Sequence, residues 1–270
     1  MVTLPDTKNT VLSLSGGWLT IALNTPENRN ALSEDTVREL LQTFSAIKED
    51  RTVRGVTLRG EGGVFCAGGD LKAFALSLSG GIPREDVAAM NLAGAKLFRT
   101  VAQAPQTVIA LVEGAAVAGG LGLMCCADIA VATRSAKFAL TETQLGITPA
   151  QIAPYVVERI GRVAAKRLML TAARFDGANA VALGLVDRIV DDAAGLDAEE
   201  SEIRRAVLNC APGANAATKA LVMKTQNLSG EAFADHAAGV FADCLLSDEG
   251  REGVAAFAMK RKPYWAPKDD

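Results

Sequence analysis

The N-terminal part of the chain alternates between apolar and polar residues. The apolar positions flank Ser15-Gly16-Gly17 and are Leu12, Leu14, Leu19, Ile21 and Leu23. Alternation with a period of two is typical of a half-buried strand, and a glycine pair between two such runs is typical of a hairpin turn. The pattern therefore predicts two antiparallel strands joined by a tight turn.

A helical period follows. Apolar residues recur every three or four positions after Ser33, at Val37, Leu40, Leu41, Phe44 and Ile47. This spacing predicts an amphipathic helix, and serine is a favourable residue to cap its N-terminus. A second helix is predicted over Arg84 to Ala102.

Short apolar runs predict further strands at 55–58, 108–112 and 129–132. Between the last two runs, the small residues from Ala115 to Gly120 predict a turn that leads into a helix ending near Cys126. Strands that alternate with helices indicate an α/β fold with a layered sheet. Helical patterns dominate from about Ala194 onward, so we expect an α/β core over 1–195 and a helical C-terminal region over 196–270.

Charge is nearly balanced, with 28 Lys and Arg against 31 Asp and Glu over 270 residues. Binding to nucleic-acid phosphates needs a basic footprint, so we expect no nucleic-acid partner. The most apolar stretch, Val108 to Ala127, contains Glu113 and four glycines, which is untypical of a membrane span. No signal-peptide pattern is seen at the N-terminus, and the five cysteines include no C-x-x-C pair. We therefore expect a cytoplasmic protein with no membrane partner.

The chain contains one histidine, His236. A single histidine excludes multi-histidine metal centres and makes a Ser-His-Asp hydrolase a poor candidate, so no metal site is expected. The phosphate-binding and dinucleotide-binding glycine motifs are also missing from the sequence. The candidate chemistry is therefore left to carboxylates, backbone amides or cysteines.

Two glycine-containing loops each follow a predicted strand: Cys66-Ala67-Gly68-Gly69-Asp70 and Val117-Ala118-Gly119-Gly120. Glycine lets a ligand approach the backbone closely, and amides at a helix N-terminus attract negative charge. Two such loops facing one point would bind an oxyanion. The alternative is that both are close-packed turns in a chain that has 25 glycines.

The sequence resembles the enoyl-CoA hydratase/isomerase (crotonase) superfamily over nearly its whole length. The motifs that carry the resemblance are 26–32, 65–72, 113–120, 126–129, 138–146 and 257–263. It implies a crotonase-type ββα spiral core with a helical C-terminal region, assembled as a homotrimer or a dimer of trimers. It also implies an acyl-CoA substrate, whose coenzyme A is part of the substrate, and no separate cofactor.

The resemblance implies that the amides of Gly69 and Gly119 hold the thioester oxygen and that Glu142 is the acid–base residue. By itself, a glutamate in a segment of threonines and a glutamine is typical of a solvent-exposed surface. Apolar neighbours are expected to exclude water from its carboxyl group and raise its pKa, namely Phe138, Leu140 and Leu145.

Further substrate contacts are implied at matching positions: Arg29, Ala67, Gly68, Asp70, Leu71, Lys72, Gly122, Phe257 and Lys260. For the cationic residues among them, the alternative is an ordinary solvated charge. Asp70 is expected to brace the glycine loop rather than act as an acid. Cys66 has no adjacent basic residue to activate it, so we do not expect a nucleophile there.

The chain departs from the family pattern at Gly122, where hydratases usually carry a second glutamate. A single carboxylate suits the isomerisation of 3-enoyl-CoA to 2-enoyl-CoA, because one group can remove and return the proton. The segment 142–156, however, resembles bacterial hydratases of branched glutaconyl-CoA thioesters, which also have glycine at this position. We therefore expect an enoyl-CoA hydratase. The alternatives are an isomerase and a non-catalytic acyl-CoA-binding relative.

Overall fold

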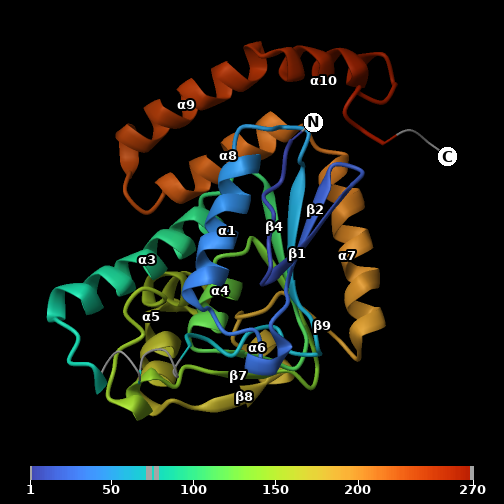
Figure 1. Cartoon of the computed structure of the whole chain (residues 1–270). Coiled ribbons are helices and arrows are strands. Elements are labelled where there is room, and N and C mark those ends of the chain that lie inside the picture. The colour runs from blue at the N-terminus through green and yellow to red at the C-terminus, as the bar shows by residue number, and fades with distance from the viewer. Residues whose placement is uncertain (1, 71–74, 76–78, 268–270) are drawn as a thin grey trace.

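The computed structural model of the chain describes residues 2–70, 75 and 79–267 (Figure 1). Its strands are β1 (Thr10–Ser15), β2 (Trp18–Leu23), β3 (Gly55–Gly60), β4 (Thr107–Val112), β5 (Ala115–Val117), β6 (Ile129–Thr133), β7 (Lys137–Ala139), β8 (Arg174–Asp176) and β9 (Arg188–Val190). Its α-helices are α1 (Glu34–Ile47), α3 (Arg84–Ala102), α4 (Gly119–Cys125), α5 (Ala153–Thr171), α6 (Gly177–Ala182), α7 (Ala193–Leu208), α8 (Pro212–Lys224), α9 (Gly230–Leu246) and α10 (Asp248–Ala258). Two short 3-10 helices are η1 (Pro26–Asn28) and η2 (Glu142–Leu145).

Within the described ranges, the main sheet has the strand order β1-β2-β3-β4-β6-β9. The predicted hairpin is confirmed: β1 pairs antiparallel with β2, while the remaining neighbours pair parallel. Parallel strands covered on both faces are continuously apolar, whereas an edge strand alternates. Accordingly, β4 is buried from its second residue onward, and β1 alternates between buried or half-buried and exposed positions.

The strand β4 separates two apolar cores. Val108, Ala110 and Val112 belong to the larger core, to which α1, α3, α4 and α5 contribute. Ile109 and Leu111 point to the opposite face, where they meet residues of α7: Leu196, Ile203 and Val207. The predicted boundary at 195/196 therefore falls inside a helix that packs on the sheet.

A smaller sheet in the described residues has the order β5-β7-β8. Its strands β5 and β7 are parallel, and their last residues, Val117 and Ala139, are paired. The predicted turn over Ala115 to Gly120 was wrong for the first three residues, which form β5. Their strand partners come from β7 and from a bridge between Cys66 and Ala116, and a local pattern of small residues does not reveal such distant partners.

The C-terminal region is helical, as predicted, and much of it lies apart from the sheet. In Figure 1, α9 and α10 cross the top of the molecule, far from β7 and β8 at the bottom. The helices α8 and α9, both fully described, bury none of their residues in the single chain. Large apolar side chains are exposed here, including Phe241, Leu246, Val254, Phe257 and Met259.

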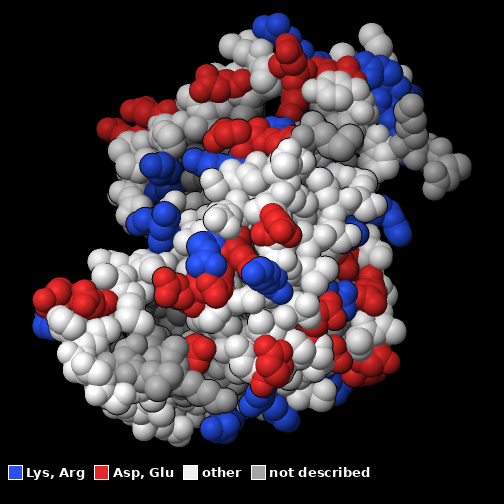
Figure 2. Space-filling view, in the orientation of Figure 1, with Lys and Arg blue, Asp and Glu red and all other residues white. Residues whose placement is uncertain are grey.

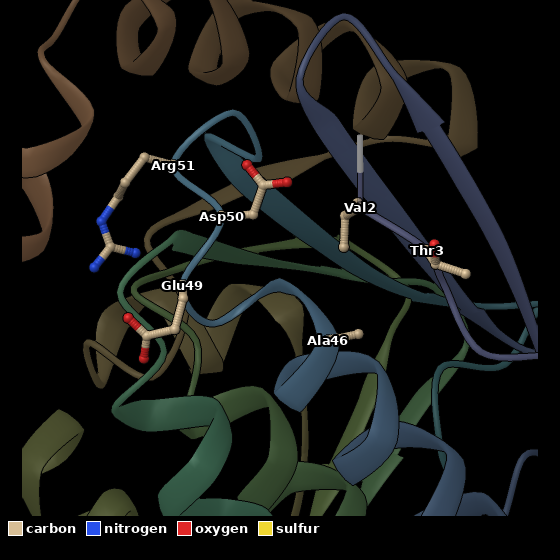
Figure 3. A pocket seen from close by; sticks show the side chains of 6 residues that line it. All are labelled: Val2, Thr3, Ala46, Glu49, Asp50 and Arg51. Atoms are coloured by element: carbon tan, nitrogen blue, oxygen red, sulfur yellow. The ribbon is translucent and has the colours of Figure 1, made fainter.

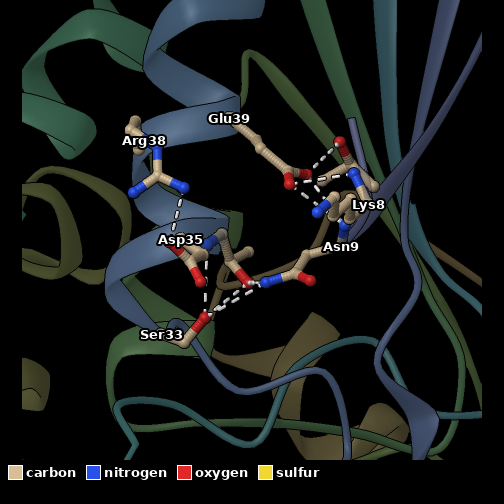
Figure 4. A network of polar contacts seen from close by, with 8 residues as sticks. Lys8, Asn9, Ser33, Asp35, Arg38 and Glu39 are labelled. Carbon is tan, nitrogen blue, oxygen red and sulfur yellow. Dashed lines mark hydrogen bonds and ion pairs between the residues drawn. The ribbon is translucent and has the colours of Figure 1, made fainter. Parts of the chain in front are cut away.

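A buried carboxylate on α1 ties the N-terminal segment to the core. Figure 4 shows the side chain of Glu39 pointing from α1 toward Lys8 and Asn9. Its carboxylate accepts hydrogen bonds from the Lys8 amide at 2.9 Å, from the Asn9 amide at 3.0 Å and from the Thr10 hydroxyl at 3.0 Å. This acceptor has a structural role.

We expect the substitution Glu39→Gln to lower the free energy of unfolding by about 1–3 kcal/mol, because a neutral amide accepts these hydrogen bonds less well than a carboxylate. Urea denaturation measures the change. The matched control is Glu49→Gln, at an exposed position with one long ion pair to Lys48, for which a change below about 0.5 kcal/mol is expected. Equal effects in the two variants would contradict the structural role of Glu39.

Acidic and basic side chains are interspersed over the face drawn in Figure 2. None of the helices in the described ranges combines the length and apolarity needed to cross a lipid bilayer.

Candidate active site

The two glycine loops lie against each other. Backbone hydrogen bonds of 3.0 Å on both sides of Cys66 pair the segment after β3 with β5. A Cβ atom built on Gly68 would lie 3.4 Å from the Gly119 nitrogen, and one built on Gly119 would lie 3.6 Å from the Gly69 nitrogen. The amides of Gly69 and Gly119 thus come from adjoining segments of backbone.

Close packing explains some of these glycines but not all. Gly68 has a φ of +100°, and a Cβ there would lie 2.8 Å from the Val117 carbonyl oxygen. A Cβ on Gly120 would lie 2.8 Å from the Cβ of Cys66. Gly119 differs, because the nearest atoms to its Cβ position are at 3.5 Å or more, which is ordinary contact distance. The packing interpretation therefore accounts for Gly68 and Gly120, and it leaves Gly119 unexplained.

The amides of Gly69 and Gly119 have no acceptor in the described part of the protein. Gly119 is the first residue of α4, where a helix has no internal partner for its N–H group. The carbonyl of the neighbouring Gly68 is held by the Leu32 amide at 2.7 Å, which fixes the loop without using the Gly69 amide. Both glycines are half-buried, so two donors are available to a ligand oxygen.

The residue before Gly119 is strained. Ala118 has φ +48° and ψ −123°, a conformation that costs a non-glycine residue about 1–3 kcal/mol. Hydrogen bonds hold it on both sides: its amide donates to the Ala139 carbonyl at 2.9 Å, and its carbonyl accepts from the Gly122 amide at 3.0 Å. The peptide that carries the Gly119 N–H is therefore locked in one orientation. Sequence reasoning missed Ala118, because alanine carries no signal for this conformation.

Asn30 braces the segment that leads into the first glycine loop, and sequence reasoning gave it no role although it lies in a quoted motif. Its side-chain amide donates to the Val64 carbonyl at 2.6 Å and to the Glu61 carbonyl at 2.9 Å, and its side-chain oxygen accepts from the Thr25 amide at 2.9 Å. Next to it, the Arg29 carbonyl accepts from an amide of the glycine loop.

Glu142 follows β7, just as Gly119 follows β5. Because these strands are parallel neighbours, both residues leave the same edge of the small sheet. Glu142 is only 8% exposed, and its Oε2 atom is buried with no hydrogen-bond partner among the described residues. Burial raises the pKa of the Glu142 carboxyl above its ordinary value. The sequence-based expectation of a solvent-excluded carboxyl is consistent with this burial, although one of its supposed neighbours, Leu145, is 52% exposed.

Gly122 faces an apolar side chain. A Cβ built on Gly122 would overlap the Cγ2 atom of Ile152 and lie 2.6 Å from its Cβ atom. Ile152 is only 3% exposed and belongs to the larger core. The structure therefore has no room for a side chain at position 122, and sequence reasoning missed Ile152, which is thirty positions away.

We expect Gly122→Ala to destabilise the protein by about 1–3 kcal/mol, since the new methyl group must displace Ile152. The matched control is Gly94→Ala in the middle of α3, where the nearest atom to the new methyl group is 3.9 Å away. There the gain in helix propensity should stabilise the protein by about 0.5–1 kcal/mol. Urea denaturation of both variants should thus give opposite signs, and two stabilising changes would contradict the contact at Gly122.

The remaining residues that were predicted to contact the substrate differ in how close they lie to the first glycine loop. Ala67 and Asp70 are half-buried in the first loop, and Arg29 is exposed beside it. Leu71 and Lys72 lie outside the described residues.

Phe257 and Lys260 lie at the end of α10, which packs against α8 and α9, and the structure does not bring them to the glycine loops. Phe257 is 87% exposed.

Cys66 does not look like a nucleophile. Its side chain is fully buried, and burial raises the pKa of its thiol to about 12. The thiolate that nucleophilic attack requires is therefore strongly disfavoured.

Two surface hollows lie away from these residues. Figure 3 shows the first, which is lined by Val2, Thr3, Ala46, Glu49, Asp50 and Arg51. The second runs along α1 and α3 and includes Val37, Leu41 and Ala93. Neither is lined by a predicted site residue.

Comparisons with known proteins identify relatives of this chain. Residues 14–268 match the family model "Enoyl-CoA hydratase/isomerase". The chain is 31% identical to mouse mitochondrial methylglutaconyl-CoA hydratase over 257 residues, which cover 92% of this chain and 79% of the relative. It is also 31% identical, over 257 residues and 91% of both chains, to a peroxisomal Delta(3,5)-Delta(2,4)-dienoyl-CoA isomerase of Arabidopsis thaliana.

Among solved structures, the chain is similar to Pseudomonas aeruginosa AtuE, with a TM-score of 0.93 and 46% sequence identity. The match covers 96% of this chain and 100% of that one. It confirms the expected α/β fold with a helical C-terminal region. Fold, family model and relatives agree, and the chain belongs to the enoyl-CoA hydratase/isomerase family.

Proposed function

We propose that this protein is an enoyl-CoA hydratase, which adds water across the 2,3 double bond of an acyl-CoA thioester. One observation carries the proposal: the unpaired amides of Gly69 and Gly119 lie on adjoining loops, and Glu142, whose Oε2 atom is buried without a partner, leaves the same edge of the small sheet as Gly119. Paired amides suit an oxygen that becomes negative, and a carboxyl with a raised pKa suits proton transfer near neutral pH.

In the proposed reaction, the thioester oxygen accepts hydrogen bonds from the amides of Gly69 and Gly119. The carboxylate of Glu142 takes a proton from water, and the water oxygen bonds to C3 of the enoyl group. The electron pair of the 2,3 double bond moves toward the thioester oxygen, which gives an enolate held by the two amides. Glu142 then returns a proton to C2, so that one water molecule is added and the carboxylate is restored.

A second candidate function is isomerisation of 3-enoyl-CoA to 2-enoyl-CoA. The observation that favours it is the Gly122–Ile152 contact, because position 122 has no space for a second carboxylate that would help to hold water. In this reaction Glu142 would take a proton from C2 and return it to C4, while the same amides hold the enolate oxygen.

A panel of thioesters separates the two functions. The purified protein is incubated with straight 2-enoyl-CoA, straight 3-enoyl-CoA and a branched glutaconyl-CoA, and the products are followed by mass. Hydration adds the mass of one water molecule to a 2-enoyl substrate. Turnover confined to the 3-enoyl substrate without a mass change favours the isomerase, and no turnover of any thioester favours a non-catalytic acyl-CoA-binding protein.

We propose a branched glutaconyl-CoA as the preferred substrate type, which the resemblance of 142–156 and the named mouse relative support.

We further propose a homotrimer or a dimer of trimers. The apolar side chains exposed on α9 and α10 support assembly, and in such an assembly another copy could supply Phe257 and Lys260 to the binding site. Light scattering tests the assembly, and a single-chain mass at micromolar concentration would contradict it.

A further inference from the structure

One face of α4 continues from the candidate oxyanion site to Ile152. Gly119 and Gly122 are three residues apart, so they lie on the same face of the helix, one turn from each other. The Cβ position of Gly119 faces the Gly69 loop, and the Cβ position of Gly122 is filled by the side chain of Ile152. Ile152 therefore covers the part of this face that lies one turn beyond Gly119.

The chain reaches Ile152 directly from Glu142. The Ile147 amide donates to the Glu142 carbonyl at 3.1 Å, which turns the chain back after η2. The following loop ends at Ile152, the residue that precedes α5, and the Ile152 carbonyl accepts the Val156 amide at 3.1 Å. Ile152 is thus fixed by the start of α5 while its side chain rests on Gly122.

We propose that Ile152 is a positioning residue of this site: by its contact with Gly122 it excludes water from the space beside Glu142 and limits the site to one acid–base carboxyl. The proposal rests on the proposed acyl-CoA chemistry of Glu142, which it deepens. At a solvent-exposed position, water donates hydrogen bonds to a carboxylate and stabilises its negative charge. The aliphatic side chain of Ile152 can donate no such hydrogen bond.

The causes of the raised pKa agree with this role. Burial is the main cause, and a hydrogen bond from the backbone amide of Glu142 itself acts in the opposite direction. No charged side chain in the described ranges contributes to the shift. On α5, the next titratable residue after Ile152 is Tyr155, whose ring packs against Phe98 of α3 with centroids 6.3 Å apart. Burial, rather than a neighbouring charge, is therefore the cause of the raised pKa of Glu142 that bears on the role of Ile152.

The test compares two variants of nearly equal shape, Ile152→Val and Ile152→Thr. Valine keeps the branched carbon atoms beside Gly122, and threonine replaces one methyl group by a hydroxyl that binds water. The control for a buried hydroxyl is Val156→Thr, one turn further along α5 at a position that is also fully buried. Each protein is labelled with ¹³C at its glutamate carboxyls, and the pKa of Glu142 is measured by NMR titration, with Glu142→Gln providing the assignment.

We expect Ile152→Val to keep the pKa and to keep kcat within about twofold of the wild type. Ile152→Thr should lower the pKa of Glu142, move the acidic limb of the kcat/KM profile to lower pH, and reduce kcat by up to about 100-fold with a smaller change in KM. Val156→Thr should change stability without moving the pKa. Equal pKa values in Ile152→Thr and the wild type, or an equal shift in Val156→Thr, would overturn the proposal.

The NMR titration does not depend on turnover. If the wild type converts no enoyl-CoA while the pKa of Glu142 still responds to Ile152→Thr, the proposed reaction fails and the water-exclusion role stands. If the thioester panel shows turnover and the pKa does not respond, only the role of Ile152 fails.

Discussion

The variant Glu142→Gln is expected to lower kcat by about 10²- to 10⁴-fold, because glutamine neither accepts nor returns a proton. Binding of the substrate should change much less, since the side chain keeps its size and the two amides are untouched. The measurement is steady-state kinetics on whichever thioester the panel identifies, at several pH values. A variant that keeps wild-type turnover would contradict the acid–base role and revive the non-catalytic alternative.

The same substitution should stabilise the fold at neutral pH, by about 1 kcal/mol, because a neutral amide costs less free energy to bury without a partner than a carboxylate does. The carboxyl pKa is raised in the folded protein, so below about pH 4 both folded and unfolded chains are protonated and the wild type shows no penalty. As the pH rises from there through the raised pKa, the unfolded chain loses its proton first, and the wild type loses stability that Glu142→Gln keeps. Urea denaturation across this pH range should show that the difference in the free energy of unfolding between the two proteins grows as the pH rises.

Glu39→Gln is the matched comparison, because Glu39 is equally buried but fully partnered. It should lose stability and keep kcat, whereas Glu142→Gln should gain stability and lose kcat. A common direction in stability would contradict the distinction between a partnered and an unpartnered carboxylate.

The variant Gly119→Pro is expected to lower kcat by about 10²- to 10³-fold, which corresponds to the roughly 2.7–4 kcal/mol that one oxyanion donor contributes to barrier lowering. Proline deletes the N–H group itself, which has no helical partner at the first position of α4. The preceding Ala118 lacks the extended backbone that proline favours before it, so folding of this variant is checked together with its activity. Steady-state kinetics and urea denaturation on the same sample distinguish a loss of catalytic activity from a loss of folded protein.

The control for Gly119→Pro is Ala193→Pro, which places proline at the first position of α7 after Asp192, a residue with extended backbone. This variant should fold and keep full activity. Full activity in folded Gly119→Pro would contradict the role of that amide, whereas equal losses in both variants would point to a general effect of proline at a helix start.

The elements with a sustained period were predictable from the sequence. The helix Arg84–Ala102 has the predicted bounds, and α1 follows Ser33 as expected. The strands β5, β7, β8 and β9 have only three residues each, too few to show a period, and they exist because distant segments supply their hydrogen bonds. The carboxyl-end edge that carries Gly119 and Glu142 is therefore a property of tertiary pairing.

The candidate site shows the same division. Gly69, Gly119 and Glu142 were indicated by motifs, and the structure brings the two amides together. The residues that hold this arrangement were not indicated. The strained conformation of Ala118 depends on a hydrogen bond to the distant Ala139, and the contact of Ile152 with Gly122 closes a loop of thirty residues. Local patterns identify groups able to react, whereas the supporting contacts depend on the whole fold.

Through one side chain, Asn30 joins its own backbone segment to two others, Thr25 before η1 and the loop 61–64 after β3. Local fluctuations that expose one of these segments must break bonds to the others, so the segments should open together as a single cooperative unit. Slow amide hydrogen exchange with a common opening free energy is the signature of such a unit. The loop that presents Gly69 is thereby shielded from independent fraying, even though it lies at the protein surface.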